Sequence, residues 1–148
     1  MPSAAPSDPH DLQRFVAAQD GVYVRALEEL RGGAKRSHWM WFIFPQIEGL
    51  GRSEMARRYA IRSGEEADAY LRHEVLGPRL RECAAALLGV EGKTAHDIMG
   101  FPDDLKLQSS MTLFAHVSGL GSVFHLVLQK FYRGQQDAET LKLLVAGG

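Results

Sequence analysis

The nine residues His38–Gln46 contain both tryptophans of the chain and are apolar except at their two ends. A run this apolar has to be buried, because each Å² of apolar surface removed from water contributes about 25 cal/mol to folding. The run therefore predicts the centre of the core. A histidine and a glutamine beside so much aromatic surface indicate the edge of a pocket.

Length and charge limit the number of domains and the classes of partner that this chain can have. The chain has 148 residues, enough for one domain with an ordinary hydrophobic core. It has 17 Lys and Arg residues and 18 Asp and Glu residues, so the formal charge is -1 and there is no general attraction for phosphate backbones. We therefore expect no nucleic acid partner.

The N-terminal segment and the single cysteine indicate the cellular compartment of the protein. Cys83 cannot form a disulfide within the chain. Residues 1–7 are expected to be a disordered tail, and they lack the basic and apolar segments of a signal peptide. No apolar run approaches the roughly 20 residues that cross a bilayer. We expect a cytoplasmic protein that binds no membrane, with residues 8–148 as a single helical domain.

Apolar residues recur at three- and four-residue intervals along most of the chain, which is typical of amphipathic helices. Before the aromatic run, this pattern predicts two helices separated by Asp20-Gly21. We interpret the run itself, Trp39–Phe44, as a helix because no partner strand is evident. Pro45 cannot continue it, and Gly49–Ser53 predicts a loop before a helix from about Glu54.

Capping residues mark several later helices. Ser63 with Glu66 three residues later predicts a capping box. Thr94 and Asp97 predict the start of a short helix, and Asp137 is expected to cap the last one. Each of these signals is local, because it involves residues within one helical turn.

Prolines indicate two further helix starts. Pro78 suits a first helical position, and Pro102 precedes two aspartates that would complement the positive end of a helix reaching about Val117. The whole pattern predicts an all-α fold, a single compact domain of about seven to nine short packed helices. An α/β fold is the alternative.

Four segments resemble a known family: KRSHWMWFIFPQ, Gly49-Leu50-Gly51 with Ser53, YLRHEVLGPRL and DDLKLQSSMTLF. They are similar to the blocks of a bacterial family called domain of unknown function eighteen-ten, from about Asp8 to Leu144. The resemblance implies a compact, helix-repeat-like fold and no established activity or catalytic residue. Members are sometimes mislabelled calpastatin, a disordered inhibitor, whereas this chain is 45% hydrophobic.

Polar residues after Pro102 share one helix face. Asp103, Lys106 and Ser110 fall at positions i, i+3 and i+7, beside an apolar stripe. Hydroxyls within helices commonly bond the carbonyl four residues earlier, so Ser109, Ser110 and Thr112 are more simply explained as packing residues. We do not expect a nucleophilic serine, because the sequence shows neither an activating base nor a hydrolase turn.

The ends of the aromatic run offer two chemical roles. His38 could act as a general acid or base, although a histidine bonded to a carbonyl at a helix start is the simpler interpretation. Trp41 could stack a flat ligand, although rings at helical spacing are more often core residues.

The loop Gly49–Ser53 could hold an anion through Arg52, Ser53 and free backbone amides. Lys35 and Arg36 support this interpretation. An ordinary turn with Ser53 as N-cap is the favoured alternative, because GxG alone lacks the context of a dinucleotide motif.

Two hypotheses follow, and neither includes a cofactor or a metal, since the six histidines show no zinc-helix spacing. The first is a pocket for a small anionic or nucleotide-like ligand, with hydrolysis as an added option. Its candidate residues are His38, Trp41, Gln46, Arg52, Ser53, Asp103, Lys106 and Ser110. It requires Trp41 and Lys106 to lie together. The second is a protein-interaction module without catalytic activity, whose protein partner the sequence does not identify.

Overall fold

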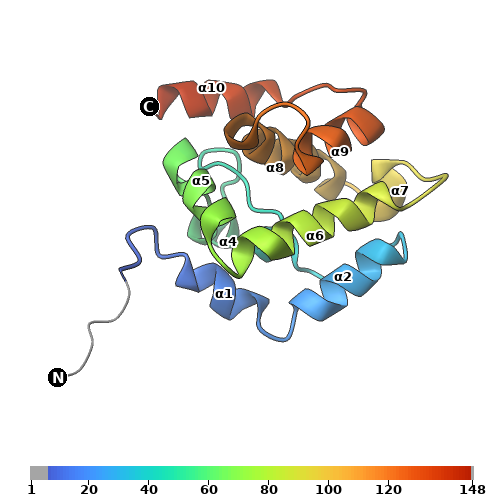
Figure 1. The fold of residues 1–148 in the computed structure, drawn as a ribbon, viewed down its shortest axis with the longest axis horizontal. Coiled ribbons are helices and arrows are strands. Elements are labelled where there is room, and N and C mark those ends of the chain that lie inside the picture. Colours follow the sequence, from blue (N-terminus) through green and yellow to red (C-terminus); the bar gives the residue numbers. More distant parts are fainter. Residues whose placement is uncertain (1–6, 148) are drawn as a thin grey trace.

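The computed structural model describes residues 7–147, and this part of the chain is built from helices (Figure 1). The helices are α1 (Gln13–Gln19), α2 (Tyr23–Arg31), α3 (Met40–Ile43), α4 (Glu54–Arg58), α5 (Gly64–Arg72), α6 (Leu76–Leu88), α7 (Ala95–Met99), α8 (Asp103–Ser118), α9 (Val123–Tyr132) and α10 (Ala138–Ala146). Apart from Ser7, the tail predicted for residues 1–7 lies outside the described residues.

The all-α prediction is confirmed. Within residues 7–147, extended pairing is limited to one isolated parallel bridge between Ile47 and Ile61, so the α/β alternative is wrong. Seven helices have seven or more residues, and the short α3, α4 and α7 bring the number in the described part to ten. None of these helices is both long and apolar enough to cross a bilayer.

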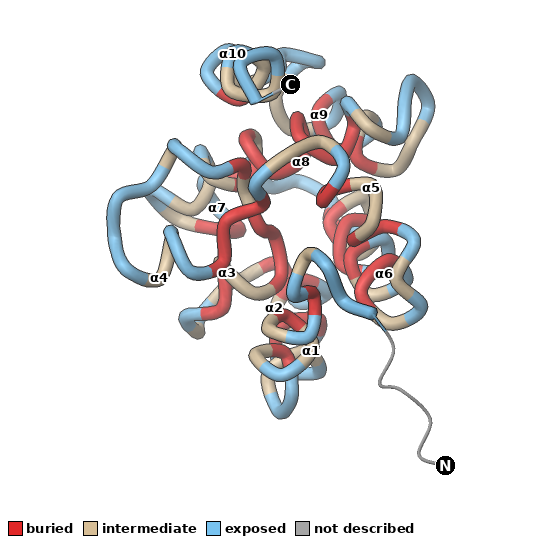
Figure 2. The backbone as a smooth tube through the Cα atoms, turned by 90° about the vertical axis from the view of Figure 1, so that its left-hand side faces the viewer, coloured by how far each residue is buried: buried red, intermediate tan, exposed pale blue. Residues whose placement is uncertain are grey.

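Two helices organise the packing. α6 packs against α2, α5 and α9, whereas α8 packs against α5, α7, α9 and α10. In Figure 1, α10 lies over α8 at the top and α1 and α2 lie at the bottom, with α6 crossing between them. The buried backbone segments run through the middle of this arrangement (Figure 2). The largest side chains enclosed there include Trp39, Tyr70, Phe15, Phe44 and Phe114.

The aromatic run lies in this core, but less of it is helical than predicted. α3 covers only Met40–Ile43, because Trp39 and Phe44 have non-helical backbones, with φ of -132° and -125°. Trp39 is completely buried, whereas Trp41 is only partly buried. The two tryptophans therefore differ: one is a core residue and the other reaches the surface.

The capping signals are confirmed with one exception. Thr94 and Asp97 form both bonds of a capping box, and Asp137 accepts the Thr140 N–H at 3.1 Å. Ser63 accepts the Glu66 N–H, but the Glu66 side chain does not return to Ser63. The predicted capping box at Ser63 is therefore only half formed.

α6 begins two residues before the predicted start. His73 Nδ1 accepts the N–H groups of Val75 and Leu76 at 3.1 and 3.2 Å, so the first turn forms at Leu76. Pro78 is then the third helical residue rather than the first. Proline is tolerated there because the first N–H groups of a helix have no partner within it.

Candidate functional site

Two adjoining hollows lie where the aromatic run meets the start of α8. The Phe101 hollow, about 370 Å³, is lined by residues that include Lys35, Arg36, His38, Met99, Phe101 and Asp103. The Arg52 hollow, about 430 Å³, is lined by residues that include Gln46, Arg52, Ser53, Leu105, Ser109 and Asp137. Both share Trp41, Pro102 and Lys106. Volumes of this size suit small organic ligands.

Trp41 and Lys106 contact each other where the two hollows adjoin. The Lys106 Nζ lies 5.6 Å from the centroid of the Trp41 ring, a cation–π distance. The same amine is 3.9 Å from the Asp103 carboxylate, one turn earlier on α8. The aromatic run therefore packs beside the polar flank of α8, as the pocket hypothesis requires.

Protein groups already engage both carboxylates of the hollows. Lys35 Nζ lies 2.8 Å from Asp103 Oδ2, and the Lys35 side chain is only 7% exposed. Asp137 Oδ2 accepts hydrogen bonds from the Ser109 and Thr140 hydroxyls and from the Thr140 N–H. The side chains of Arg36 and Arg52 form no ion pair with any residue between 7 and 147. Positive charge is therefore in excess here.

Seven of the eight candidate residues line these hollows, and Ser110 is the exception. Ser110 is completely buried, and its hydroxyl has no hydrogen-bond partner among the described residues. Its position on the same helix face as Lys106 placed it in the candidate set. The structure shows that one further turn of α8 takes this face from the surface into the core.

Several simpler interpretations are confirmed. Ser53 accepts the Ala56 N–H at 3.1 Å and caps α4, a helix of only five residues. A Cβ on Gly51 would lie 2.5 Å from the Ala56 Cβ, so this tight turn requires glycine. Ser109 and Thr112 donate to the carbonyls four residues earlier, at 3.2 and 2.8 Å. The Gly49–Ser53 loop and these hydroxyls therefore serve the local structure. Arg52 is the loop residue whose charge forms no ion pair with residues 7–147.

Glu29 holds the segment that borders the Phe101 hollow. Its Oε1 accepts the N–H groups of Arg36 and Ser37 and the Trp39 indole N–H, at 2.8 to 3.0 Å. Its Oε2 accepts the Ser37 hydroxyl at 2.6 Å. Burial alone would raise the pKa of Glu29, but these hydrogen bonds outweigh it and lower the pKa from 4.5 to about 2.

Replacing Glu29 by glutamine is expected to lower the free energy of unfolding by about 1–2 kcal/mol at pH 7, because hydrogen bonds to a charged acceptor are weakened. The folded pKa is below the unfolded one, so this contribution is present above pH 4.5 and is lost as the pH falls toward 2. Urea unfolding of both proteins between pH 7 and pH 3 measures it. A difference that stays constant below pH 4.5 would contradict the assignment.

His38 is exposed at the Phe101 hollow, and within residues 7–147 its side chain does not donate to a carbonyl as expected at a helix start. In the described part of the chain, no serine hydroxyl hydrogen-bonds a histidine ring. No group of three or more His, Cys, Asp or Glu residues in that part is arranged to hold a metal ion. Cys83 is fully buried, as expected, and burial raises the pKa of its thiol to about 12.

Comparison with known proteins gives the family. The family model described as protein of unknown function DUF1810 matches residues 9–144. This chain belongs to the DUF1810 family. The resemblance seen in the four sequence segments is therefore confirmed.

A solved relative supports the fold. The DUF1810 chain is 54% identical to the conserved hypothetical protein Rv1873 from Mycobacterium tuberculosis, whose crystal structure superposes with a TM-score of 0.91. The match covers 93% of this chain and 99% of that one. No curated protein matches the chain.

The candidate set lacked several residues that line the DUF1810 hollows, among them Phe101 and Asp137. Asp137 was recognised only as a helix cap. Phe101 stands between Gly100 and Pro102, outside every apolar stripe. A large apolar residue that fits no helical period was the available signal.

Proposed function

We propose that this DUF1810 protein binds a small anionic molecule in the two adjoining hollows. One observation carries the proposal: four cationic side chains line the two hollows, but only two carboxylates do, and protein donors already engage both carboxylates. The cations are Lys35, Arg36, Arg52 and Lys106. The chain as a whole has a net charge of -1, so the positive excess is local. Such a concentration attracts anions to one place on the surface.

The groups at the hollows suit anion recognition. Arg36 and Arg52 can each present two parallel N–H donors to a carboxylate or phosphate. Lys106 adds an ammonium group shared by both hollows, and the Gln46 amide adds a neutral donor. A phosphate or carboxylate beside Lys106 would therefore find donors on both sides.

The proposal also includes hydrolysis of the bound ligand, with His38 as the general base that accepts a proton. The exposed imidazole borders the Phe101 hollow, and its ring nitrogens can accept and donate a proton. Because no described serine is paired with a histidine, water is the nucleophile of this step. His38 takes one proton of the water as its oxygen bonds to the phosphorus of a phosphoanhydride, and the P–O bond to the leaving phosphate breaks, so that this phosphate departs with the bonding electrons. Turnover abolished in His38→Gln with ligand affinity unchanged would support this role.

Replacing Lys106 by glutamine is expected to weaken the binding of inorganic pyrophosphate by about tenfold, because hydrogen bonds to charged groups contribute about 1.5–3 kcal/mol. Titration calorimetry at low salt measures the affinity. The matched control is Lys142→Gln, since Lys142 is exposed on α10 and lines neither hollow. Absence of binding to pyrophosphate and to nucleotides, or equal affinity in both variants, would reject the proposal.

The protein-interaction hypothesis draws support from exposed apolar residues at the same place. Phe101 and Leu105 are 74% and 51% exposed on the rims of the hollows. Apolar residues of this kind are typical of contact surfaces. The calorimetric test separates the two, because an interaction module would not bind pyrophosphate more tightly through Lys106.

A further inference from the structure

Phe101 is the most exposed aromatic side chain that lines either hollow. It is 74% exposed, although fully burying a phenylalanine stabilises a protein by about 1.5–3 kcal/mol. Leu120 and Val145 are more exposed still, but they line neither hollow. Phe101 thus combines a free apolar surface with a concave position.

The Phe101 hollow is lined by groups that suit a flat aromatic ring. Met99 and Met40, 5% and 2% exposed, lie at the same hollow, and Trp41 contributes a second, partly buried ring. Thioethers and aromatic rings both make favourable contacts with a planar aromatic ligand. Lys35 neutralises Asp103 at 2.8 Å, so the carboxylate in this hollow does not repel an anion strongly.

The Arg52 hollow has a different character. Its one aromatic side chain is Trp41, which it shares with the Phe101 hollow. It adds Arg52, which has no ion pair among residues 7–147, and the Gln46 amide. The Phe101 hollow therefore offers a ring site in addition to the cations Arg36 and Lys106, whereas the Arg52 hollow has no ring of its own and suits an anionic group.

We infer that the ligand is an aromatic phosphate of the nucleoside phosphate class, with its ring against Phe101 and its phosphates beside Lys106 and Arg52. This inference rests on the proposed anion site and adds the ligand class and its direction across the hollows. One molecule can occupy both hollows because they meet at Trp41 and Lys106. Phe101 is then a binding residue.

Two probes separate the ring from the phosphates. ADP carries a nucleobase and a diphosphate, whereas inorganic pyrophosphate carries only the anionic part. Stacking on one aromatic side chain gives about a tenfold gain in affinity. We therefore expect the protein to bind ADP at least tenfold more tightly than pyrophosphate in titration calorimetry.

Two variants test the placement. Phe101→Ala is expected to remove the advantage of ADP and to leave pyrophosphate binding unchanged. Arg52→Gln is expected to weaken both probes by a similar factor. Because Phe101 and Arg52 are exposed, neither change is expected to lower the melting temperature. Leu120→Ala, at an 89% exposed position outside the hollows, is the control for Phe101.

The outcomes are distinguishable. If pyrophosphate binds through Lys106 as tightly as ADP does, or if Phe101→Ala leaves ADP affinity unchanged, the ring site is rejected and the anion site stands. If Phe101→Ala weakens ADP but Arg52→Gln changes neither probe, the direction across the hollows is wrong. If neither probe binds, the inference and the proposed function fail together.

Discussion

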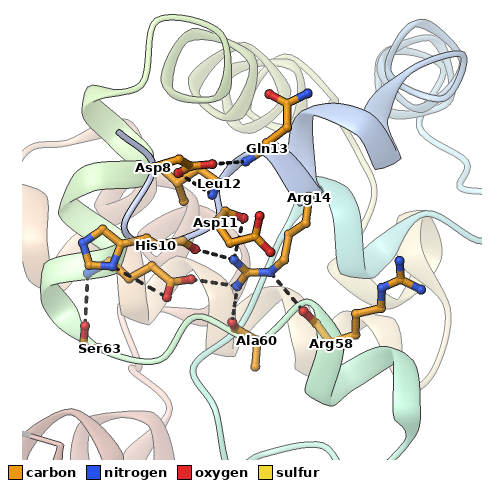
Figure 3. A network of polar contacts seen from close by, with 10 residues as sticks. Asp8, His10, Asp11, Leu12, Gln13, Arg14, Arg58, Ala60 and Ser63 are labelled. Atoms are coloured by element: carbon orange, nitrogen blue, oxygen red, sulfur yellow. Dashed lines mark hydrogen bonds and ion pairs between the residues drawn. The ribbon is translucent and has the colours of Figure 1, made fainter. Parts of the chain in front are cut away.

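Replacing Arg14 by alanine is expected to lower the free energy of unfolding by about 3–5 kcal/mol, because it removes the guanidinium that pairs with the buried carboxylate of Glu66. The Arg14 Nη2 lies 2.9 Å from Glu66 Oε2, and the two side chains are 9% and 1% exposed. All five N–H groups of the guanidinium are used (Figure 3): the other four donate to the carbonyls of His10, Asp11, Arg58 and Ala60. One side chain thus ties the N-terminal segment to the loop before α5.

Urea unfolding followed by circular dichroism measures this effect. The matched control is Arg72→Ala, which removes an ion pair with Asp68 from a side chain that is 80% exposed. Surface pairs of this kind contribute about 0–1 kcal/mol, so the control should differ little from the parent protein. A loss in Arg14→Ala no larger than in the control would show that the buried pair does not stabilise the fold.

Replacing Gly77 by alanine is expected to destabilise the protein by about 1–3 kcal/mol or more, the usual cost of overpacking. An added Cβ would lie 2.1 Å from the Leu71 carbonyl oxygen and 2.9 Å from its carbon. Both are backbone atoms, so a rotamer change cannot relieve the clash. Alanine normally stabilises a helix over glycine by about 0.4–1 kcal/mol, but this gain is smaller than the clash.

Gly64→Ala tests the same substitution without the clash. Gly64 is the first residue of α5, and the nearest atoms to an added Cβ are 3.8 and 3.9 Å away, at ordinary contact distance. We expect its melting temperature to be unchanged or slightly higher, whereas that of Gly77→Ala should fall by several degrees. Equal melting temperatures in the two variants would contradict the close approach of α6 to Leu71.

Local signals predicted the helices well. The Thr94–Asp97 capping box and the Asp137 cap involve residues three apart, so the sequence contains both partners of each bond. At Glu66 the local signal did not predict the partner of the side chain. Its spacing from Ser63 predicted a capping bond, but its carboxylate pairs with Arg14, 52 positions earlier. A buried arginine is a stronger partner than a backbone amide, and only tertiary packing brings it there.

The candidate site likewise includes residues that the sequence indicated and residues that it did not. The pocket hypothesis required Trp41 and Lys106 to lie together, and the structure places the Lys106 Nζ 5.6 Å from the centroid of the Trp41 ring. Ser110 is buried and lines neither hollow, because a helix face does not show how deep each of its turns lies. Phe101 was missed because its exposure depends on the direction in which the chain enters α8.

Residue types and their intervals were enough to determine the helical class, most helix ends and the burial of Trp39, since these depend on contacts within a few positions and on the low solubility of apolar surface. Packing alone decided the ion pair of Arg14, the bonds that hold Glu29 and the meeting of the two hollows. Those features join segments far apart in the chain, and no local pattern encodes which distant groups will become neighbours.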